Sequence, residues 1–164
     1  MNSPTFAPRL TITLLACAML SFAAAPNLSA ETPPDQIKAA GAIPLNEALF
    51  NKMDEFVKAV GQDAGARAEM AEINKDPSIG PENWGSTINA KCPKTVALLK
   101  DAGLTADEFS KGIFAIMAIG LSEGLDKSTD KTVKANAEFI AANQERAGNL
   151  FGAFMALGEP AAKP

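Results

Sequence analysis

Ala102-Gly-Leu-Thr-Ala-Asp-Glu-Phe-Ser-Lys-Gly-Ile-Phe-Ala-Ile-Met-Ala-Ile-Gly-Leu-Ser-Glu-Gly124 is the part of this 164-residue chain with the clearest structural signal. A T-x-x-E capping box at Thr105 and Glu108 predicts the start of a helix. The closing glycine is a common stop signal. Between them, the run Ile113 to Leu121 is apolar on almost every side of a helix. A helix of that kind is buried, so we expect a buried central helix at about residues 105–124.

The composition favours a single all-α domain. Hydrophobic residues make up 47% of the chain, and strand-forming residues are scarce beside the helix formers Ala, Leu, Lys and Glu. Histidine is absent, which excludes a Ser-His-Asp triad and His-ligated zinc or haem. The net charge is −4, and no cluster of Lys and Arg overrides it, which argues against a nucleic-acid partner. We expect no metal and no cofactor.

Residues 1–30 have the pattern of a secretion signal peptide. Arg9 precedes an apolar segment from Leu10 to Ala25, and small residues lead to Ala30. This order of basic, apolar and small-residue regions is typical of exported proteins. We expect a periplasmic or secreted protein cleaved near Ala30.

A lipoprotein is the alternative reading of the same segment. Leu14-Leu-Ala-Cys17 resembles a lipobox, although Cys17 lies in the middle of the apolar run. A membrane association is expected only if Cys17 carries a lipid. Cleavage near Ala30 leaves Cys92 as the mature chain's one cysteine, and it has no partner for an internal disulfide.

The remaining chain divides into a leader, a helical domain and a tail. Residues 31–43 lack apolar periodicity, so we expect a flexible leader. Residues 44–158 are expected to form the helical domain, followed by a tail at 159–164. Within the domain, 44–74 is helical, and Gly61 and Gly65 leave open whether it forms one helix or two. A turn is expected at 86–91, followed by a helix that begins at Cys92 or Pro93.

The last helix is predicted at about 131–157 from a regular apolar seam. Its members step alternately by three and four residues, which is the spacing of an a/d seam. They are Val133, Asn136, Ile140, Asn143, Ala147, Leu150, Phe154 and Leu157. Together with the helix at 105–124, these elements predict a compact four- to five-helix bundle.

Six residues are candidates for a functional site. Asn136 and Asn143 are the polar members of the seam; they either fix helix register or line a groove or dimer seam. Gly112 and Gly120 in the central helix allow either a close helix approach or space for an apolar ligand, with Phe139 nearby on the last helix. Cys92, between two lysines, is either a buried apolar residue or a reactive thiol.

Two motifs resemble a pattern in a family of small exported bacterial all-helical proteins of unknown function. They are Ala102-Gly-Leu-Thr-x-x-Glu-Phe109 and Asn136-x-x-Phe-Ile-x-x-Asn143. The resemblance covers about residues 90–145 and implies an exported helical protein, without an activity. The family commonly has histidine where this chain has Asn143, so a metal or proton role at that position does not carry over.

These observations favour a non-catalytic exported protein that acts by binding an unknown protein partner or by forming a homo-oligomer. One alternative is a carrier or sensor of a small apolar ligand, held between the helix at 105–124 and the Phe- and Met-rich end of the last helix. The other alternative is a thiol-dependent activity at Cys92.

Overall fold

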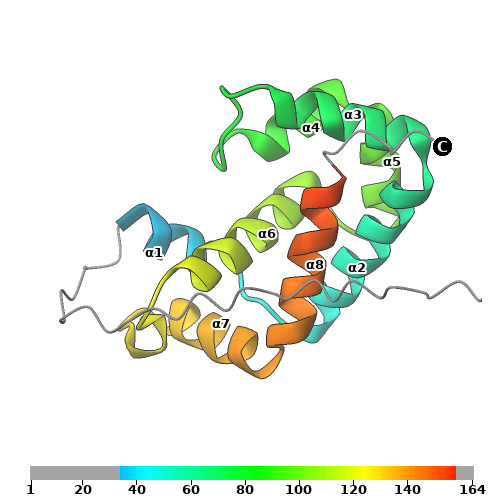
Figure 1. Ribbon diagram of the computed structural model, residues 1–164. Helices are drawn as coiled ribbons and strands as arrows, with labels where there is room; N and C mark the ends of the chain where they lie inside the picture. Colours follow the sequence, from blue (N-terminus) through cyan, green and yellow to red (C-terminus); the bar gives the residue numbers. More distant parts are fainter. Residues whose placement is uncertain (1–33, 158–164) are drawn as a thin grey trace, which may run out of the picture. The chain divides into compact units, whose positions relative to one another are not determined.

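The computed structural model describes residues 34–157, and in this part the chain is all-helical without a strand (Figure 1). The predicted signal peptide at 1–30, the lipobox Cys17 and the tail at 159–164 lie outside the described residues. The helices are α1 Pro34–Ala40, α2 Glu47–Gln62, α3 Ala64–Lys75, α4 Trp84–Lys91, α5 Pro93–Asp101, α6 Ala106–Leu121, α7 Lys131–Ala142 and α8 Gln144–Ala156, with a 3₁₀ turn, η1, at Leu125–Lys127. Within residues 34–157, no helix combines the length and the apolar character needed to cross a membrane.

The prediction of an all-α fold is confirmed, but the expected four to five helices are too few, because the described residues form eight α-helices. The first reason is a break at Asp63. Its extended backbone ends α2, and its carboxylate accepts hydrogen bonds from the backbone N–H groups of Gly65 and Ala66, both at 2.8 Å. A side chain that caps a new helix start favours two helices over one. The segment 44–74, left open by the sequence, is therefore two helices.

The predicted single helix at 131–157 is also wrong, because Asn143 separates α7 from α8. The Asn143 amide donates to the carbonyl of Phe139 at 2.9 Å, and its backbone N–H lies 3.1 Å from the carbonyls of Phe139 and Ile140. These bonds satisfy the orphan carbonyls at the end of α7. Every other member of the predicted seam is buried, so the spacing indicated the burial pattern correctly across the break.

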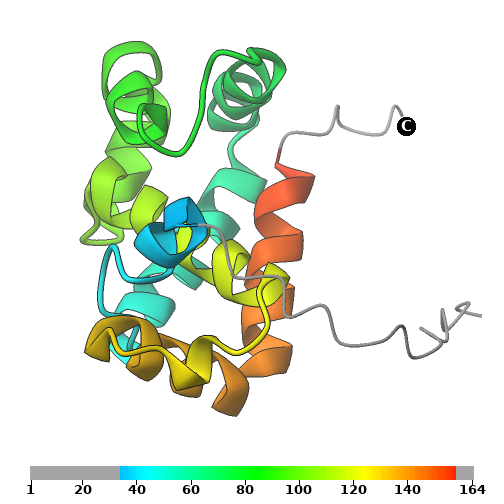
Figure 2. The same ribbon diagram turned by 90° about the vertical axis from the view of Figure 1, so that its left-hand side faces the viewer.

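The prediction of a flexible leader at 31–43 is wrong for Pro34–Ala40, which form α1. The helix packs against α6 and α7 (Figures 1 and 2), and Ala40 is fully buried. The side chain of Ser122 donates to that of Gln36 at 2.8 Å. A helix of seven residues is unstable alone, so these long-range contacts, which leave no periodic pattern, explain why the sequence did not reveal it.

The turn expected at 86–91 is wrong as well, because these residues belong to α4. The second part of that prediction is confirmed, since α5 begins at Pro93. Its first turn is capped from α3: the Glu69 carboxylate accepts from the backbone N–H and the hydroxyl of Thr95, both at 2.8 Å. This bond fixes α3 against α5.

The signals for the start of α6 are confirmed, but the helix ends at Leu121, three residues before the Gly124 expected to stop it. Thr105 and Glu108 form the capping box, with the Thr105 hydroxyl accepting from the Glu108 N–H at 3.1 Å and the Glu108 carboxylate accepting from the Thr105 N–H at 2.9 Å. The hydrogen bonds that the Glu108 carboxylate accepts from the N–H and from the hydroxyl of Thr105 lower the pKa of Glu108. Gly103 ends the preceding helix with a φ of 69°, as a C′ glycine does.

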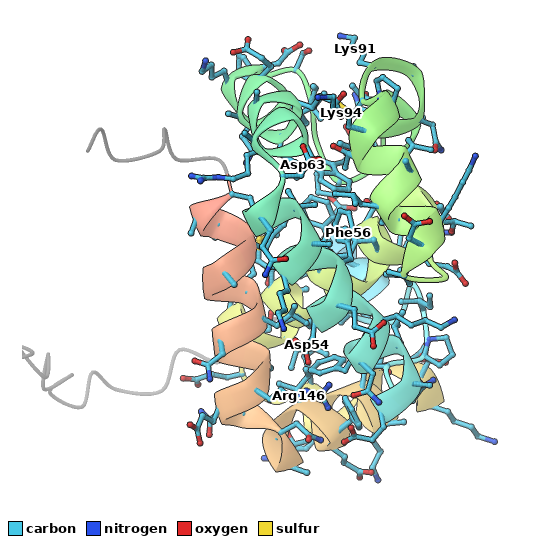
Figure 3. All side chains as sticks on the ribbon, turned by 90° about the vertical axis from the view of Figure 1, so that its right-hand side faces the viewer. Asp54, Phe56, Asp63, Lys91, Lys94 and Arg146 are labelled. Carbon is cyan, nitrogen blue, oxygen red and sulfur yellow. The ribbon has the colours of Figure 1, made fainter. Side chains whose placement is uncertain are left out.

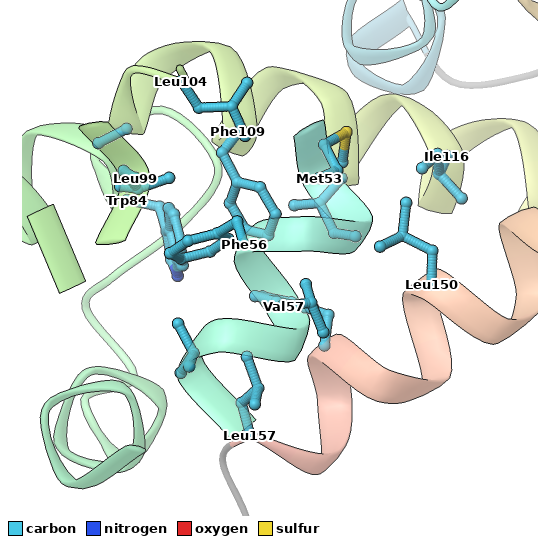
Figure 4. Packing of buried hydrophobic residues seen from close by; sticks show 14 of the residues in the cluster. Met53, Phe56, Val57, Trp84, Leu99, Leu104, Phe109, Ile116, Leu150 and Leu157 are labelled. Atoms are coloured by element: carbon cyan, nitrogen blue, oxygen red, sulfur yellow. The ribbon is translucent and has the colours of Figure 1, made fainter. Parts of the chain in front are cut away.

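The main core collects buried side chains from α2 to α8, among them Phe109 of α6 (Figure 4). The ring of Phe109 lies 4.6 Å from that of Phe56 in α2, and 5.7 Å from those of Trp84 in α4 and Phe154 in α8, measured between centroids. One side chain of α6 thus contacts aromatic rings from three other helices.

Candidate functional site

A groove runs between the C-terminal half of α6 and the two last helices. It measures about 570 Å³, within the range of about 300–1,000 Å³ that small-molecule sites occupy. We call it the α6–α8 groove. It is lined by Ile116, Met117, Ile119, Gly120 and Leu121 of α6, by Ala137, Ile140 and Ala141 of α7, and by Gln144, Ala147, Gly148 and Phe151 of α8.

The lining of the α6–α8 groove is almost entirely apolar. Gln144 provides the single polar side chain, and no charged residue lines the groove. Leu121 is 72% exposed, an unusual exposure for a large apolar side chain next to a hollow. Because the lining holds no acid, base or nucleophile, the chemistry it offers is the burial of apolar surface.

Two glycines keep the groove open. A Cβ atom at Gly120 or at Gly148 would meet nothing within 4 Å, so the missing side chains leave real space. Gly112 differs, because its Cβ position lies 2.9 Å from the sulfur of Met53. Of the two glycines predicted from sequence, Gly120 therefore borders the groove, and Gly112 instead makes room for the side chain of Met53 from α2.

The other predicted residues lie elsewhere. Asn136 is 1% exposed, accepts from the N–H of Leu45 at 2.8 Å, and donates to the carbonyls of Ala40 at 2.7 Å and Ile43 at 2.8 Å. These bonds use its oxygen and both hydrogens inside the protein. Phe139 packs edge-on against Phe50, with ring centroids 5.0 Å apart. Asn143 caps α7. The structure does not bring these three to the α6–α8 groove.

Sequence reasoning placed an apolar ligand against the last helix but named as site residues none of those that form the α8 wall of the groove. Gln144, Ala147, Gly148 and Phe151 follow the i, i+3, i+4, i+7 spacing of one helix face. The small residues at 147 and 148 were the available signal, since a helix face built from Ala and Gly leaves room beside it. The predicted seam assigned Ala147 to packing and so concealed this signal.

Arg146, also missed, ties α8 to α2 (Figure 3). Its guanidinium donates to Asp54 at 2.6 and 2.9 Å, to Glu47 at 2.6 Å and to Asn51 at 2.6 Å. Its carbon centre lies 5.5 Å from the centroid of Phe50. The hydrogen bonds with Asp54, and secondarily with Glu47, raise the pKa of Arg146. This cluster fixes the position of α8, which forms one wall of the groove.

Cys92 lies between α4 and α5 and is 2% exposed. Burial, with a smaller contribution from the charge of Glu69, raises its pKa to about 11. Neutral pH therefore leaves the side chain as a thiol, which is the unreactive form. Among the residues that the structure describes, no three His, Cys, Asp or Glu side chains come together as a metal site.

We predict that the native thiol does not react with Ellman's reagent at about pH 8, because the thiolate is the nucleophile. The same protein unfolded in guanidinium chloride is expected to react at once, since unfolding exposes Cys92 and restores its ordinary pKa. The measurement is the absorbance of the released thionitrobenzoate. Rapid reaction of the folded protein would contradict the buried state and revive a thiol-dependent activity.

No family model, no curated protein and no solved structure matches this chain. The resemblance of its two motifs to a family of exported helical proteins therefore stays a prediction.

Proposed function

We propose that this protein is a non-catalytic binding protein that holds a small, uncharged, apolar molecule in the α6–α8 groove. The observation that carries the proposal is an open groove of about 570 Å³ with an uncharged lining. It lies between the two helical regions that the sequence indicated for a carrier or sensor. The amide of Gln144 is the one lining side chain that offers hydrogen bonds, so a ligand with at most one polar end fits best.

Two further inferences concern the position of α6 in the fold and the cellular location of the protein. We infer that α6 is the central helix of a compact bundle, since half of its sixteen residues are buried and it contacts α1, α4, α7 and α8. From the pattern at 1–30 we also infer a periplasmic or secreted location. A carrier of apolar molecules would there shield its ligand from water.

The test is the titration of the protein with N-phenyl-1-naphthylamine, an uncharged apolar probe whose fluorescence rises when it leaves water. The key variant is Gly148→Leu, which places a side chain in the groove. We expect its dissociation constant for the probe to rise about tenfold or more relative to the parent. The variant should fold, because its Cβ meets nothing within 4 Å and leucine is the better helix former by about 0.5–1 kcal/mol.

Gly152→Leu is the matched control. It makes the same change on the same helix, its Cβ also meets nothing within 4 Å, and it does not line the groove. We expect parental probe binding. Equal binding by both leucine variants, or no saturable binding by the parent, would overturn the proposal.

Self-association is a second candidate for the same surface. Leu121, which lines the groove, is 72% exposed, and Met155, four residues after the lining residue Phe151, is 55% exposed. A two-fold dimer needs a self-complementary surface, such as exposed apolar side chains next to a groove. Light scattering over a range of concentrations tests it: a dimer that Leu121→Glu converts to monomer would favour this candidate, and a parental monomer at every concentration would remove it.

A further inference from the structure

A second groove lies on the other side of α8, against α2. It measures about 600 Å³, and we call it the α2–α8 groove. Arg146, Asn149, Leu150, Ala153 and Ala156 contribute from α8, and Leu157 follows directly after it. One helix thus separates two hollows whose linings differ in chemistry.

Buried apolar side chains and small residues form the floor of the α2–α8 groove. Val57, Leu150 and Leu157 are buried and line it together with Gly61 and Ala153. A Cβ atom at Gly61 would meet nothing within 4 Å. An apolar body of modest size therefore has room there and gains free energy by leaving water.

The charges of the α2–α8 groove set it apart. Lys58, Arg67 and Arg146 line it, against the single acidic residue Asp54, in a chain whose net charge is −4. Asp54 is engaged by Arg146. Lys58 and Arg67 make no ion pair with any residue from 34 to 157. Two cations beside an apolar floor thus remain free to attract an anion.

Arg146 also lines the α2–α8 groove, but its guanidinium is already bound by neighbouring side chains. Its guanidinium makes four hydrogen bonds, to Glu47, Asn51 and Asp54, out of the five N–H donors that an arginine offers. Because two carboxylates already balance its charge, it holds the α8 wall in place and leaves the recognition of an anion to Lys58 and Arg67.

We propose that the α2–α8 groove binds an amphiphilic anion from solution. The apolar body lies on Val57, Leu150 and Leu157, and a carboxylate, sulfonate or phosphate group faces Lys58 and Arg67. This site lies outside the α6–α8 groove and takes a different class of ligand, so it goes beyond the function proposed above. A free molecule is favoured over a lipid held in a bilayer, because an acyl chain must leave the bilayer to reach a floor that is buried between two helices.

The experiment compares two probes that share one ring system. 8-Anilinonaphthalene-1-sulfonate carries the anionic group, and N-phenyl-1-naphthylamine is the same arylamine without it. The test variant is Lys58→Gln/Arg67→Gln. The matched control is Lys100→Gln/Lys131→Gln, which removes the same charge from two exposed lysines that line neither groove.

We expect the Lys58→Gln/Arg67→Gln variant to bind the sulfonate probe about tenfold more weakly than the parent, since two partly exposed charges contribute on that order. Its affinity for the uncharged probe should stay parental, and the control should bind both probes within about twofold of the parent. Gly61→Leu, which fills the floor, should also weaken binding of the sulfonate probe and leave the uncharged probe unaffected.

Competition identifies the source of the anion. Sodium octanoate is expected to displace the sulfonate probe, whereas phosphatidylglycerol vesicles are not. Three outcomes would overturn the proposal: equal sulfonate binding by the Lys58→Gln/Arg67→Gln variant and the control, equal weakening of both probes by that variant, or displacement by the vesicles alone. If the uncharged probe fails to bind while the sulfonate result holds, the function proposed for the α6–α8 groove fails and this site stands.

Discussion

Replacement of Asn136 by leucine is expected to lower the free energy of unfolding by about 3–5 kcal/mol. The substitution removes the amide that bonds the N–H of Leu45 and the carbonyls of Ala40 and Ile43. Each backbone group left buried without a partner costs about 1–3 kcal/mol. Leucine offers no hydrogen bond in return, and the site is 1% exposed, so water cannot take the place of the amide without a rearrangement.

Urea unfolding followed by the fluorescence of Trp84 measures this loss. Asn149→Leu is the matched control, because Asn149 is exposed and makes no side-chain hydrogen bond with a described residue. Its effect should stay within about 0.5 kcal/mol. A loss at Asn136 no larger than the loss at Asn149 would mean that the three hydrogen bonds do not hold the segment.

The same variant has a local consequence for α1. The helix is too short to persist alone, and the Asn136 amide holds the chain directly after it. Native-state hydrogen exchange of residues 34–45 should therefore accelerate in Asn136→Leu more than exchange in α2 does. Equal acceleration in both segments would show that α1 unfolds only with the rest of the protein.

The parts of the fold that depend on neighbours in sequence could be predicted. The capping box at Thr105 and Glu108, the glycine at 103 and the proline at the start of α5 are local signals, and all are present. The sequence left the break at Asp63 open, and the break at Asn143 was not predicted. A helix that ends at an Asp or Asn loses a few backbone hydrogen bonds and gains packing between the two shorter helices. The sequence alone does not show whether the continuous or the broken helix buries more apolar surface.

The candidate sites were less accessible to sequence reasoning. For Gly120 the sequence left two readings open, close helix approach and space for an apolar ligand, because a glycine inside an apolar helix leaves a volume that a larger side chain would fill. Asn136 was recognised as important, but its hydrogen-bond partners lie 91 to 96 residues away in the chain. No local sequence pattern identifies such distant partners. The ion pairs of Arg146 with α2 span similar separations. These long-range hydrogen bonds and ion pairs exist only once the chain has folded, and those of Arg146 fix α8, which borders both grooves.

Replacement of Phe109 by alanine is expected to lower the free energy of unfolding by about 3–5 kcal/mol. The ring is fully buried and lies against Phe56, Trp84 and Phe154 at centroid distances of 4.6 to 5.7 Å. Its removal loses the transfer free energy of the ring and leaves a cavity between α2, α4, α6 and α8. Because four helices surround the cavity, collapse of one of them cannot fill it.

Phe151→Ala is the control for Phe109→Ala. Phe151 is partly buried at the α6–α8 groove, so its loss widens a space that is already open, and a smaller cost of about 1–2 kcal/mol is expected. Phe109→Leu should recover a large part of the stability by restoring volume. Urea unfolding provides the free energies, and the emission of Trp84 in the folded state reports whether its contact with position 109 has changed. A cost at Phe109 below that at Phe151 would contradict the inference that α6 is the central helix, because the most buried ring of that helix would then contribute less than one at the edge of a groove.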